Sequence, residues 1–340
     1  MNQMTNGPEL SICIANYNGA GLIDRCLDSV FAQRCNLTFE VVLHDDASTD
    51  SSVQHIRERY SEVRIIESRQ NIGFCIANNR MAAAATGRYL LLLNNDAELR
   101  PGSIDAFAEA AACHPSAILG LPQCSLHDGK VVDYGYRFDL FMNPIPRLTP
   151  GAAEVDTVTG ACLWVPRATW SALGGFPVWF ESVAEDIYLC QAARLLGYPV
   201  RILPGPPFDH WIGARLGGGK VVAGRLGTTT RRRALSERNK MAVMLVCEPI
   251  WALALLLPVH ALLLMIEAVA MWAGGADRNK ISRIYLGAFR WLIEQRGDVA
   301  ALRRSLRARR CVGDVAYMRR FHVVPQKLRL LLRHGFPRID

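Results

Sequence analysis

The stretch Arg88-Tyr-Leu-Leu-Leu-Leu-Asn-Asn-Asp96 is an apolar run that ends abruptly in two amides and an acid. An unbroken apolar run of this kind, without alternation, predicts a β-strand that is buried on both faces. Further apolar runs at residues 10–15, 39–43 and 63–66 are separated by helical patterns, in which apolar residues recur on one face. Strands that alternate with helices predict an α/β fold with a mostly parallel, doubly wound sheet.

Three of these four predicted strands end in polar clusters, which are Asn16-Tyr17-Asn18, Asp45-Asp46 and Asn94-Asn95-Asp96. In a doubly wound sheet, ligands bind beyond the carboxyl ends of the strands. Loops in contact with water also make strand ends polar, and for one cluster alone that explanation would be preferred. Three such ends, two of them with Asp, favour a ligand site.

Two common phosphate-binding motifs are incomplete or absent. Gly19-Ala20-Gly21 follows the first predicted strand, as a dinucleotide-binding turn would, but Asp24 stands where the third glycine belongs. An acid at that position would face a pyrophosphate, and the sequence has no G-x-x-x-x-G-K-[ST] loop. A dinucleotide-dependent dehydrogenase and a P-loop enzyme are therefore both disfavoured.

Residues 157–227 add three features that each have a structural and a functional interpretation. Asp186 stands at the start of a helical pattern, where a carboxylate either caps the helix or acts as a general base. His210 lies in a loop rich in proline and aromatic residues, where it either packs or binds a metal ion as neutral imidazole. The glycine-rich residues 213–227 are either a mobile basic lid over phosphates or a flexible linker.

In their order and spacing, six blocks within residues 9–212 resemble family 2 glycosyltransferases with the GT-A fold, especially the bacterial rhamnosyltransferase-like branch. The blocks are Ser11-Ile-Cys-Ile-Ala-Asn-Tyr-Asn-Gly19, His44-Asp-Asp-Ala-Ser-Thr-Asp-Ser-Ser52, Asn71-Ile-Gly-Phe-Cys-Ile-Ala-Asn78, Leu91-Leu-Leu-Asn-Asn-Asp96, Thr159-Gly-Ala161, and Gly174-Gly-Phe176 with Glu185-Asp-Ile-Tyr-Leu-Cys190. The resemblance implies a GT-A nucleotide-diphospho-sugar transferase fold. Its nucleotide-binding half would be residues 9–115, and its acceptor and catalytic half would be residues 116–230.

The resemblance also implies roles for the matched residues. Asp186 would be the catalytic base, and Asp96, as the last acid of a D-x-D-type motif, would bind Mg²⁺ or Mn²⁺ together with His210. The nucleotide sugar would be bound by Asn16, Tyr17, Asn18, Asp46, Asn71, Gly73 and Asn95, with Asp46 on the pyrimidine base. Asn94 departs from the pattern, because many relatives have Asp there, and this leaves one carboxylate for the metal.

These roles predict an inverting glycosyltransferase that moves a hexosyl or deoxyhexosyl group from a nucleoside-diphosphate donor, dTDP-rhamnose or a UDP-hexose, to a hydroxyl group. The acceptor is expected to be a cell-surface glycan or a polyprenyl-linked saccharide. A transition state of oxocarbenium character needs a base for the acceptor proton and a cation for the leaving diphosphate. The alternative, motivated by Asn94, is a non-catalytic nucleotide-sugar-binding or assembly subunit of a glycan-synthesis complex.

The C-terminal third differs from the rest of the chain in charge and hydropathy. Residues 274–340 hold 16 Lys and Arg against 5 Asp and Glu, a net charge of +11, whereas residues 1–230 hold 18 against 23, a net charge of −5. Residues 250–266 contain no Asp, Glu, Lys or Arg, and basic residues flank them on both sides. This pattern predicts an in-plane or re-entrant helix pair that is bent at Pro258.

The sequence thus predicts a catalytic domain over residues 1–230 and an apolar, basic helical region over residues 231–340. The second region is expected to bind an anionic membrane surface, at the cytoplasmic face of a bacterial inner membrane. One alternative is a core helix at a homodimer interface. Another is a nucleic-acid-binding tail, which is disfavoured because no nucleic-acid motif is present. Ten cysteines without a C-x-x-C pair, and an N-terminus without the order of a signal peptide, fit a reducing cytosol.

Overall fold

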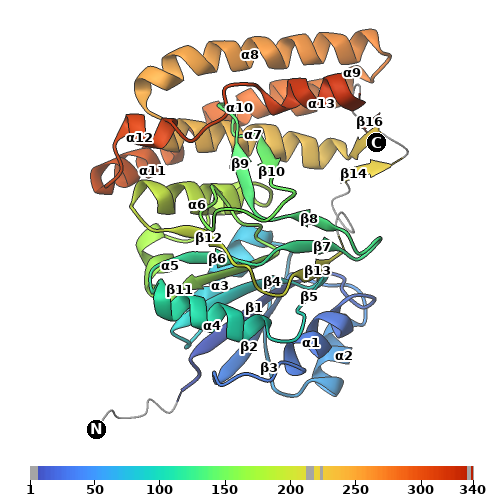
Figure 1. Ribbon diagram of the computed structural model, residues 1–340. Helices are drawn as coiled ribbons and strands as arrows, with labels where there is room; N and C mark the ends of the chain where they lie inside the picture. Colours follow the sequence, from blue (N-terminus) through green and yellow to red (C-terminus); the bar gives the residue numbers. More distant parts are fainter. Residues whose placement is uncertain (1–6, 212–217, 223–224, 335–337, 340) are drawn as a thin grey trace. The chain divides into compact units, whose positions relative to one another are not determined.

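The computed structural model describes residues 7–211, 218–222, 225–334 and 338–339 (Figure 1). The chain divides into two compact units. The first unit holds residues 1–135, 146–193 and 198–211, and the second holds residues 136–145, 194–197 and 212–340. The sequence-based boundary at residue 230 stays a prediction, because compactness alone does not identify a segment that folds independently.

A seven-stranded sheet forms the centre of the first unit, in the order β12-β6-β11-β4-β1-β2-β3 (Figure 1). Its strands are β1 Leu10–Asn16, β2 Phe39–Asp45, β3 Val63–Glu67, β4 Tyr89–Asn94, β6 Ile118–Gly120, β11 Cys162–Pro166 and β12 Val200–Ile202. Neighbouring strands pair in parallel except at β11, which is antiparallel to both β4 and β6. This topology confirms the predicted mostly parallel α/β sheet.

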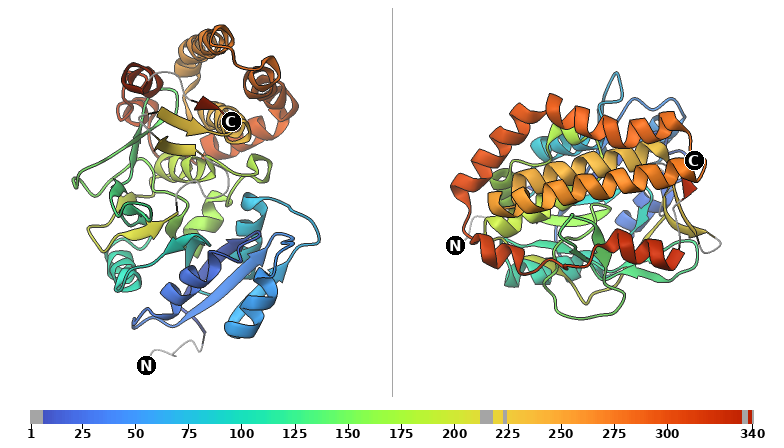
Figure 2. Two further views of the ribbon diagram at one scale, coloured as in Figure 1. Left: turned by 90° about the vertical axis from the view of Figure 1, so that its right-hand side faces the viewer. Right: turned by 90° about the horizontal axis from the view of Figure 1, so that it is seen from above.

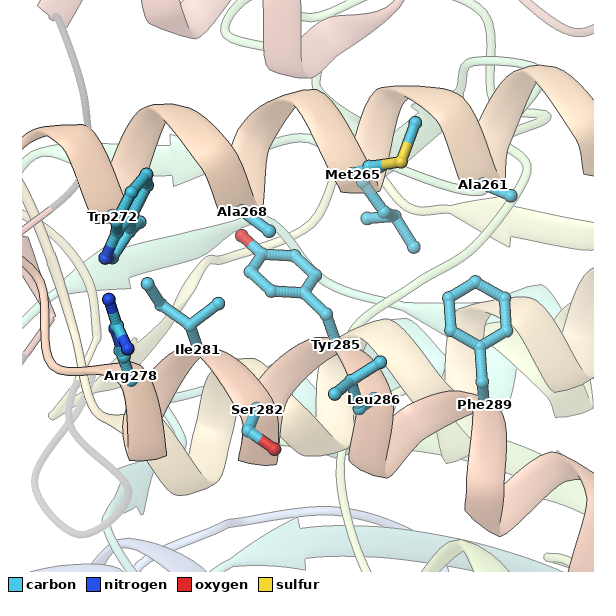
Figure 3. Close-up of a pocket in the computed structure, with 11 residues that line it drawn as sticks. Ala261, Met265, Ala268, Trp272, Arg278, Ile281, Ser282, Tyr285, Leu286 and Phe289 are labelled. Atoms are coloured by element: carbon cyan, nitrogen blue, oxygen red, sulfur yellow. The ribbon is translucent and has the colours of Figure 1, made fainter.

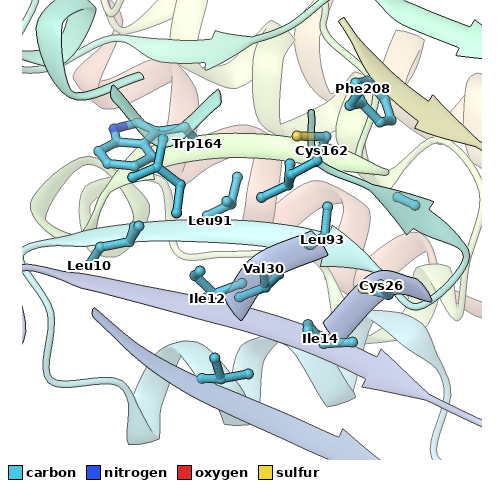
Figure 4. Packing of buried hydrophobic residues seen from close by; sticks show 14 of the residues in the cluster. Leu10, Ile12, Ile14, Cys26, Val30, Leu91, Leu93, Cys162, Trp164 and Phe208 are labelled. Carbon is cyan, nitrogen blue, oxygen red and sulfur yellow. The ribbon is translucent and has the colours of Figure 1, made fainter. Parts of the chain in front are cut away.

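Helices cover the sheet and bury its apolar strands. They are α1 Ile23–Phe31, α2 Ser52–Arg59, α3 Phe74–Ala84, α4 Ser103–Cys113, α5 Arg167–Leu173, the 3-10 turn η1 Val178–Phe180, and α6 Glu185–Leu195, whose last two residues belong to the second unit. Ile12 and Ile14 of β1 pack against Leu93 of β4 and against Cys26 and Val30 of α1 (Figure 4). The intervening Cys13 is also fully buried, so β1 is covered on both faces, as its unbroken apolar run predicts.

The first unit also contains a second sheet of four strands, one of which follows β4 directly in the chain. Its strands, in the order β5-β13-β7-β8, are β5 Ala97–Glu98, β13 Phe208–His210, β7 Gln123–Ser125 and β8 Val131–Asp133. β13 is antiparallel to β5, and the register pairs His210 with Ala97. The chain segment around residue 210 is therefore held beside the segment that follows β4.

The second unit is built mainly from helices (Figure 2). Its elements are β9 Tyr136–Phe138, β10 Pro144–Pro146, whose last residue belongs to the first unit, β14 Gly218–Val222, β15 Arg225–Thr228, α7 Thr230–Cys247, α8 Ile250–Ala273, α9 Arg278–Ile281, the π-helical turn η2 Ser282–Leu286, α10 Gly287–Glu294, α11 Arg296–Arg309, α12 Asp314–Met318, α13 Gln326–His334 and β16 Arg338–Ile339. β14 and β15 pair antiparallel within the glycine-rich segment. Residues 213–217 and 223–224, on which the predicted lid also depends, lie outside the described residues.

The predicted bend at Pro258 is not found, because α8 is continuous from Ile250 to Ala273 and passes through this proline. Pro258 is exposed, so the helix can adjust around the missing N–H on its solvent side. The chain turns instead at Pro249, the N-cap of α8, and at Glu248, which is extended at the end of α7. A residue before proline disfavours helical backbone, and this steric conflict ends α7.

Glu248 is fully buried in the second unit, and neither of its carboxylate oxygens has a hydrogen-bond partner among the described residues. Burial raises the pKa of this carboxyl to about 8, with a smaller contribution from Asp139. The folded protein therefore binds this proton more tightly than the unfolded chain does. The resulting stabilisation is complete below the ordinary pKa of 4.5 and is lost as the pH rises through about 8.

We expect Glu248→Gln to raise the Tm above about pH 8 and to leave it unchanged near pH 4, where the native carboxyl is also neutral in both states. The rise should reach several degrees, because each pKa unit corresponds to about 1.4 kcal/mol of stability. Differential scanning calorimetry measures the effect. Glu294→Gln, at an exposed carboxylate of α10, is the control. A rise of equal size at both pH values would contradict this explanation.

Candidate active site

Asn16, the last residue of β1, connects the ends of three neighbouring strands. Its Nδ2 donates to Asp45 Oδ1 at the end of β2 (2.9 Å) and to Ser52 Oγ (3.0 Å). Its Oδ1 accepts from Asn95 Nδ2, just beyond β4 (2.8 Å). Both ends of this fully buried amide are thus used to fix the strand ends. The predicted contacts of Asn16 and Asn95 with a nucleotide stay predictions.

Asp46, which follows β2, holds the loop that precedes α3. Its Oδ1 accepts from the Ile72 N–H (2.7 Å) and its Oδ2 from the Gly73 N–H (2.9 Å). Gly73 has a φ of +88°, where other residues are strained, and a Cβ there would lie 3.4 Å from the Glu181 carbonyl oxygen. The carboxylate of Asp46 therefore fixes a glycine turn, next to which Asn71 is exposed.

Tyr17 and Asn18 form the exposed rim of the β1 end. Asn18 has a left-handed backbone with a φ of 50°. It is held there because its N–H donates to Ser48 Oγ (2.8 Å) and its Oδ1 accepts from the Thr49 N–H (2.7 Å). The Tyr17 side chain is 40% exposed, so its ring offers an open surface on which a flat base can stack.

We expect Asp46→Asn to lower the free energy of unfolding by about 1–3 kcal/mol, because an amide NH₂ would face one of the two backbone N–H donors and leave it unsatisfied. Urea denaturation followed by circular dichroism measures the change. Glu62→Gln, at an exposed carboxylate, is the matched control and should be neutral. Equal stability of Asp46→Asn and the native chain would show that the carboxylate does not hold the loop.

Asp96, Asn94 and His210 converge at the end of β4. His210 Nε2 lies 3.1 Å from Asp96 Oδ1 and 3.5 Å from Asn94 Nδ2. The pairing of β13 with β5 brings these residues together although they are far apart in the chain. A bidentate ion pair between Arg100 and Asp209, with both distances 2.8 Å, fixes β13 next to this cluster. Within the described residues, no group of three or more His, Cys, Asp and Glu side chains could hold a metal ion.

The donor atoms of this cluster nevertheless fit a divalent cation. Asn94 Oδ1 and His210 Nδ1 are buried without a hydrogen-bond partner among the described residues. A half-turn of the Asn94 amide, whose oxygen and nitrogen are alike in shape, presents its oxygen toward His210 Nε2. One carboxylate, one amide oxygen and one imidazole then face the same point, and Mg²⁺ and Mn²⁺ both accept oxygen ligands. The remaining positions would be left for phosphate oxygens and water.

Asp186 lies in the first turn of α6. Its Oδ2 accepts from the Gly160 N–H (2.9 Å) and its Oδ1 from the Ile187 N–H (2.7 Å). A Cβ on Gly160 would lie only 3.4 Å from Asp186 Cβ, so the two backbones approach closely here. The next residue, Ala161, accepts through its carbonyl oxygen from the Asn94 N–H (2.9 Å). A short backbone bridge therefore links Asp186 to the end of β4.

Asp46, Asp96 and Asp186 thus lie at one edge of the seven-stranded sheet. β2 and β4 end at this edge, and β11, which is antiparallel to β4, begins there. The loop before α6 also reaches the Asp46 region, because the Glu181 carbonyl oxygen accepts from the Cys75 N–H (3.0 Å). The arrangement can bind a pyrophosphate through a cation at Asp96 and take up a proton at Asp186.

The loop before α6 carries a feature that the sequence does not signal. Glu181, Val183 and Ala184 have φ values of 62°, 72° and 69°, although none of them is glycine. Such backbones cost on the order of 1–3 kcal/mol each and occur where surrounding contacts enforce them, often at functional sites. These three residues lie just before α6, so their backbone sets where α6 begins and where Asp186 lies.

Residues 11–147 match the family described as Glycosyl transferase family 2. The chain is 29% identical over 232 residues to the N-acetylglucosaminyl-diphospho-decaprenol L-rhamnosyltransferase of Mycobacterium tuberculosis. That match covers 59% of this chain and 75% of the relative.

Solved structures with a similar fold cover most of the chain. S. aureus TarS 1–349 in complex with UDP-GlcNAc aligns with 92% of this chain and 89% of its own, at 16% identity and a TM-score of 0.57. The mannosyltransferase PcManGT from Pyrobaculum calidifontis, in complex with GDP-Man and Mn²⁺, aligns with 90% and 86%, at 18% identity and a TM-score of 0.50. At these identities the likeness shows a shared fold and nothing more.

Proposed function

We propose that this chain acts as a family 2 glycosyltransferase with the GT-A fold, and that it transfers a sugar from a nucleoside-diphosphate donor to a hydroxyl group of a lipid-linked saccharide, with inversion at the anomeric carbon. The observation that carries the proposal is the shared edge at which Asp46, Asp96 and Asp186 lie. The glycosyltransferase relatives make a non-catalytic role, which Asn94 alone motivated, unnecessary. Asn94 instead supplies an amide to the same cluster.

The proposed chemistry follows from the residues at this edge. The acceptor oxygen attacks the anomeric carbon as the bond between that carbon and the diphosphate oxygen breaks, and the hydroxyl proton passes to Asp186. A divalent cation, when bound by Asp96 and His210, supplies positive charge to the leaving diphosphate. Asp46 and the Gly73 turn shape the base side of the pocket, and Tyr17 offers its ring to the base.

The donor and acceptor are proposed from the relatives. The Mycobacterium tuberculosis relative is named for rhamnosyl transfer to a decaprenol-linked saccharide, which supports dTDP-rhamnose and a polyprenyl-linked acceptor here. The TarS structure holds UDP-GlcNAc, which supports a UDP-hexose as the alternative donor. A polyprenyl-linked acceptor would support a location at a membrane, and a cytosolic nucleotide-sugar donor would support its cytoplasmic face.

A panel of sugar nucleotides tests the proposal. The correct donor should raise the Tm in the presence of Mn²⁺, because a ligand at a hundred times its Kd stabilises the folded state by about 2.7 kcal/mol. The same donor should then label a lipid-linked acceptor with its sugar. A protein that binds no sugar nucleotide in the panel, with or without Mg²⁺ or Mn²⁺, would contradict the proposal.

A further inference from the structure

α8 is an apolar helix whose surface is largely exposed in the second unit. Within the described part of the chain it is the one helix long and apolar enough to cross a membrane, yet only 22% of its most apolar 18-residue stretch is buried. Its outer stripe of exposed side chains follows helical spacing and consists of Leu255, Val259, Leu262, Ile266 and Val269. A monomeric protein rarely leaves such a continuous apolar stripe in water.

The polar side chains of α8 face the protein. His260 is buried and stacks on Phe141, with ring centres 5.3 Å apart. Glu267 pairs with Arg233 of α7 and accepts from Lys327 Nζ of α13 (3.0 Å). α8 thus departs from the usual pattern for a helix of a soluble protein, since its polar side chains point inward and its exposed face is apolar.

These ion pairs hold α8 along the helices of the second unit. A 24-residue helix is about 36 Å long and could cross a bilayer by length alone. Crossing, however, would separate Glu267 from both cations and bury its charge in hydrocarbon, which is costly. Leu264 and Met271 of α8 also pack with Ile284 and Tyr285 in one buried cluster. The contacts therefore favour a helix that stays parallel to the surface of its unit.

A groove of about 600 Å³ opens between α8 and the segment α9–η2–α10 (Figure 3). Met265 and Trp272 from α8 face Leu286 and Phe289 across it. These four side chains are also exposed, so the groove and the outer surface of α8 form one continuous apolar region. At one end, the Arg278 guanidinium lies over the Trp272 ring, 5.5 Å from its centre.

The charge beside this region matches an anionic partner. Arg278 and Arg283 are exposed on the segment that borders the groove, and the residues from 274 onward carry a net charge of +11. A large apolar surface with cations at its edge is the pattern of a helix that lies in the headgroup region of an anionic bilayer. A second protein copy would need acidic groups opposite these cations, whereas phospholipid phosphates supply them directly.

We infer that the face of α8 and α10 is a monotopic docking surface for an anionic lipid bilayer. α8 lies in the plane of the interface, lipid chains enter the groove, and Arg278 and Arg283 contact headgroup phosphates. The docking surface rests on the proposed function, because a transferase of lipid-linked sugars would lie on a membrane.

Vesicle flotation tests the surface with the full chain. Binding to vesicles of equal parts phosphatidylcholine and phosphatidylglycerol should be strong at low salt and much weaker with phosphatidylcholine alone. Arg278→Gln/Arg283→Gln should weaken binding on the order of thirtyfold at low salt, at about 1 kcal/mol per cation. Arg304→Gln/Arg309→Gln, the same charge change at exposed positions of α11, is the control and should weaken it much less.

Apolar substitutions test the other half of the surface. Ile266→Gln/Val269→Gln should lower the partition coefficient roughly a hundredfold, from the lost burial of two branched side chains. These residues are 55% and 56% exposed, so the fold should tolerate the change. Leu148→Gln/Val178→Gln, at positions 64% and 54% exposed in the first unit, is the matched control. Thermal stabilisation by the sugar nucleotide should be unchanged in all four variants.

Three results would overturn the inference. The first is equal vesicle binding by the surface variants and their controls. The second is retention of the protein in membranes after washing with alkaline carbonate, which indicates a spanning helix, and the third is a stable dimer that covers this face and binds no vesicles. Sugar transfer to a detergent-dispersed acceptor separates the two proposals. Transfer without vesicle binding refutes docking alone, and vesicle binding without transfer refutes the proposed reaction alone.

Discussion

Asp186→Asn is expected to lower the rate of sugar transfer by about 10²–10⁴-fold, the usual contribution of a general base. Asparagine has the same shape and can keep the hydrogen bond that Asp186 Oδ2 accepts from the Gly160 N–H. It cannot, however, take up the proton of an acceptor hydroxyl. The loss should therefore fall on kcat, while the affinity for the nucleotide sugar stays within a few-fold of that of the native enzyme.

Initial-rate kinetics with saturating donor and acceptor measure this effect, and calorimetric titration of the donor measures its affinity. Asp128→Asn, at an exposed carboxylate of the same unit, is the matched control and should retain native activity. Near-native transfer by a folded Asp186→Asn enzyme would show that another group accepts the proton. An equal loss of donor affinity would indicate that Asp186 binds the donor instead.

Asp96→Asn is expected to remove most of the stimulation by Mn²⁺ and to reduce transfer by about 10²–10³-fold, because a metal ion contributes several kcal/mol to the leaving diphosphate. Asp96 is the one carboxylate of the cluster at the end of β4, since Asn94 and Asn95 are amides. Its replacement leaves the metal with neutral donors alone. His210→Asn should have a smaller effect, because it removes an uncharged ligand.

Transfer assays over a range of Mn²⁺ concentrations, with electron paramagnetic resonance of bound Mn²⁺ in the presence of nucleoside diphosphate, measure both effects. Glu98→Gln is the control, because this carboxylate lies two residues further along and pairs with Arg25 instead. If Asp96→Asn and Glu98→Gln showed the same dependence on Mn²⁺, the metal site would have to lie elsewhere.

The sheet and the strand ends could be predicted because their signals are local. Unbroken apolar runs identify β1, β2, β3 and β4 within one or two residues, and the polar residues after them mark the edge where ligands bind. The apolar spacing that follows Asp186 predicts a helix that starts near this residue, and α6 begins at Glu185. The roles of these residues stay predictions until they are tested.

Other parts of the site depend on contacts that no local pattern encodes. The pairing that sets His210 beside Asp96 uses β5 and β13, which are two and three residues long, too short for any periodicity. The left-handed backbone at Val183 and Ala184 runs against the preference of both side chains, so no local pattern signals it. The bend predicted at Pro258 is wrong, because α8 continues through this exposed proline.

The most direct measurement follows both products of a single reaction, the released nucleoside diphosphate and the sugar joined to the acceptor lipid. In the native enzyme with a divalent cation, we expect one nucleoside diphosphate for each sugar transferred and the opposite anomeric configuration in the product, with both products strongly reduced in Asp186→Asn. Release of nucleoside diphosphate at the same rate without acceptor and regardless of Asp186, or a product that retains the donor's configuration, would contradict the account.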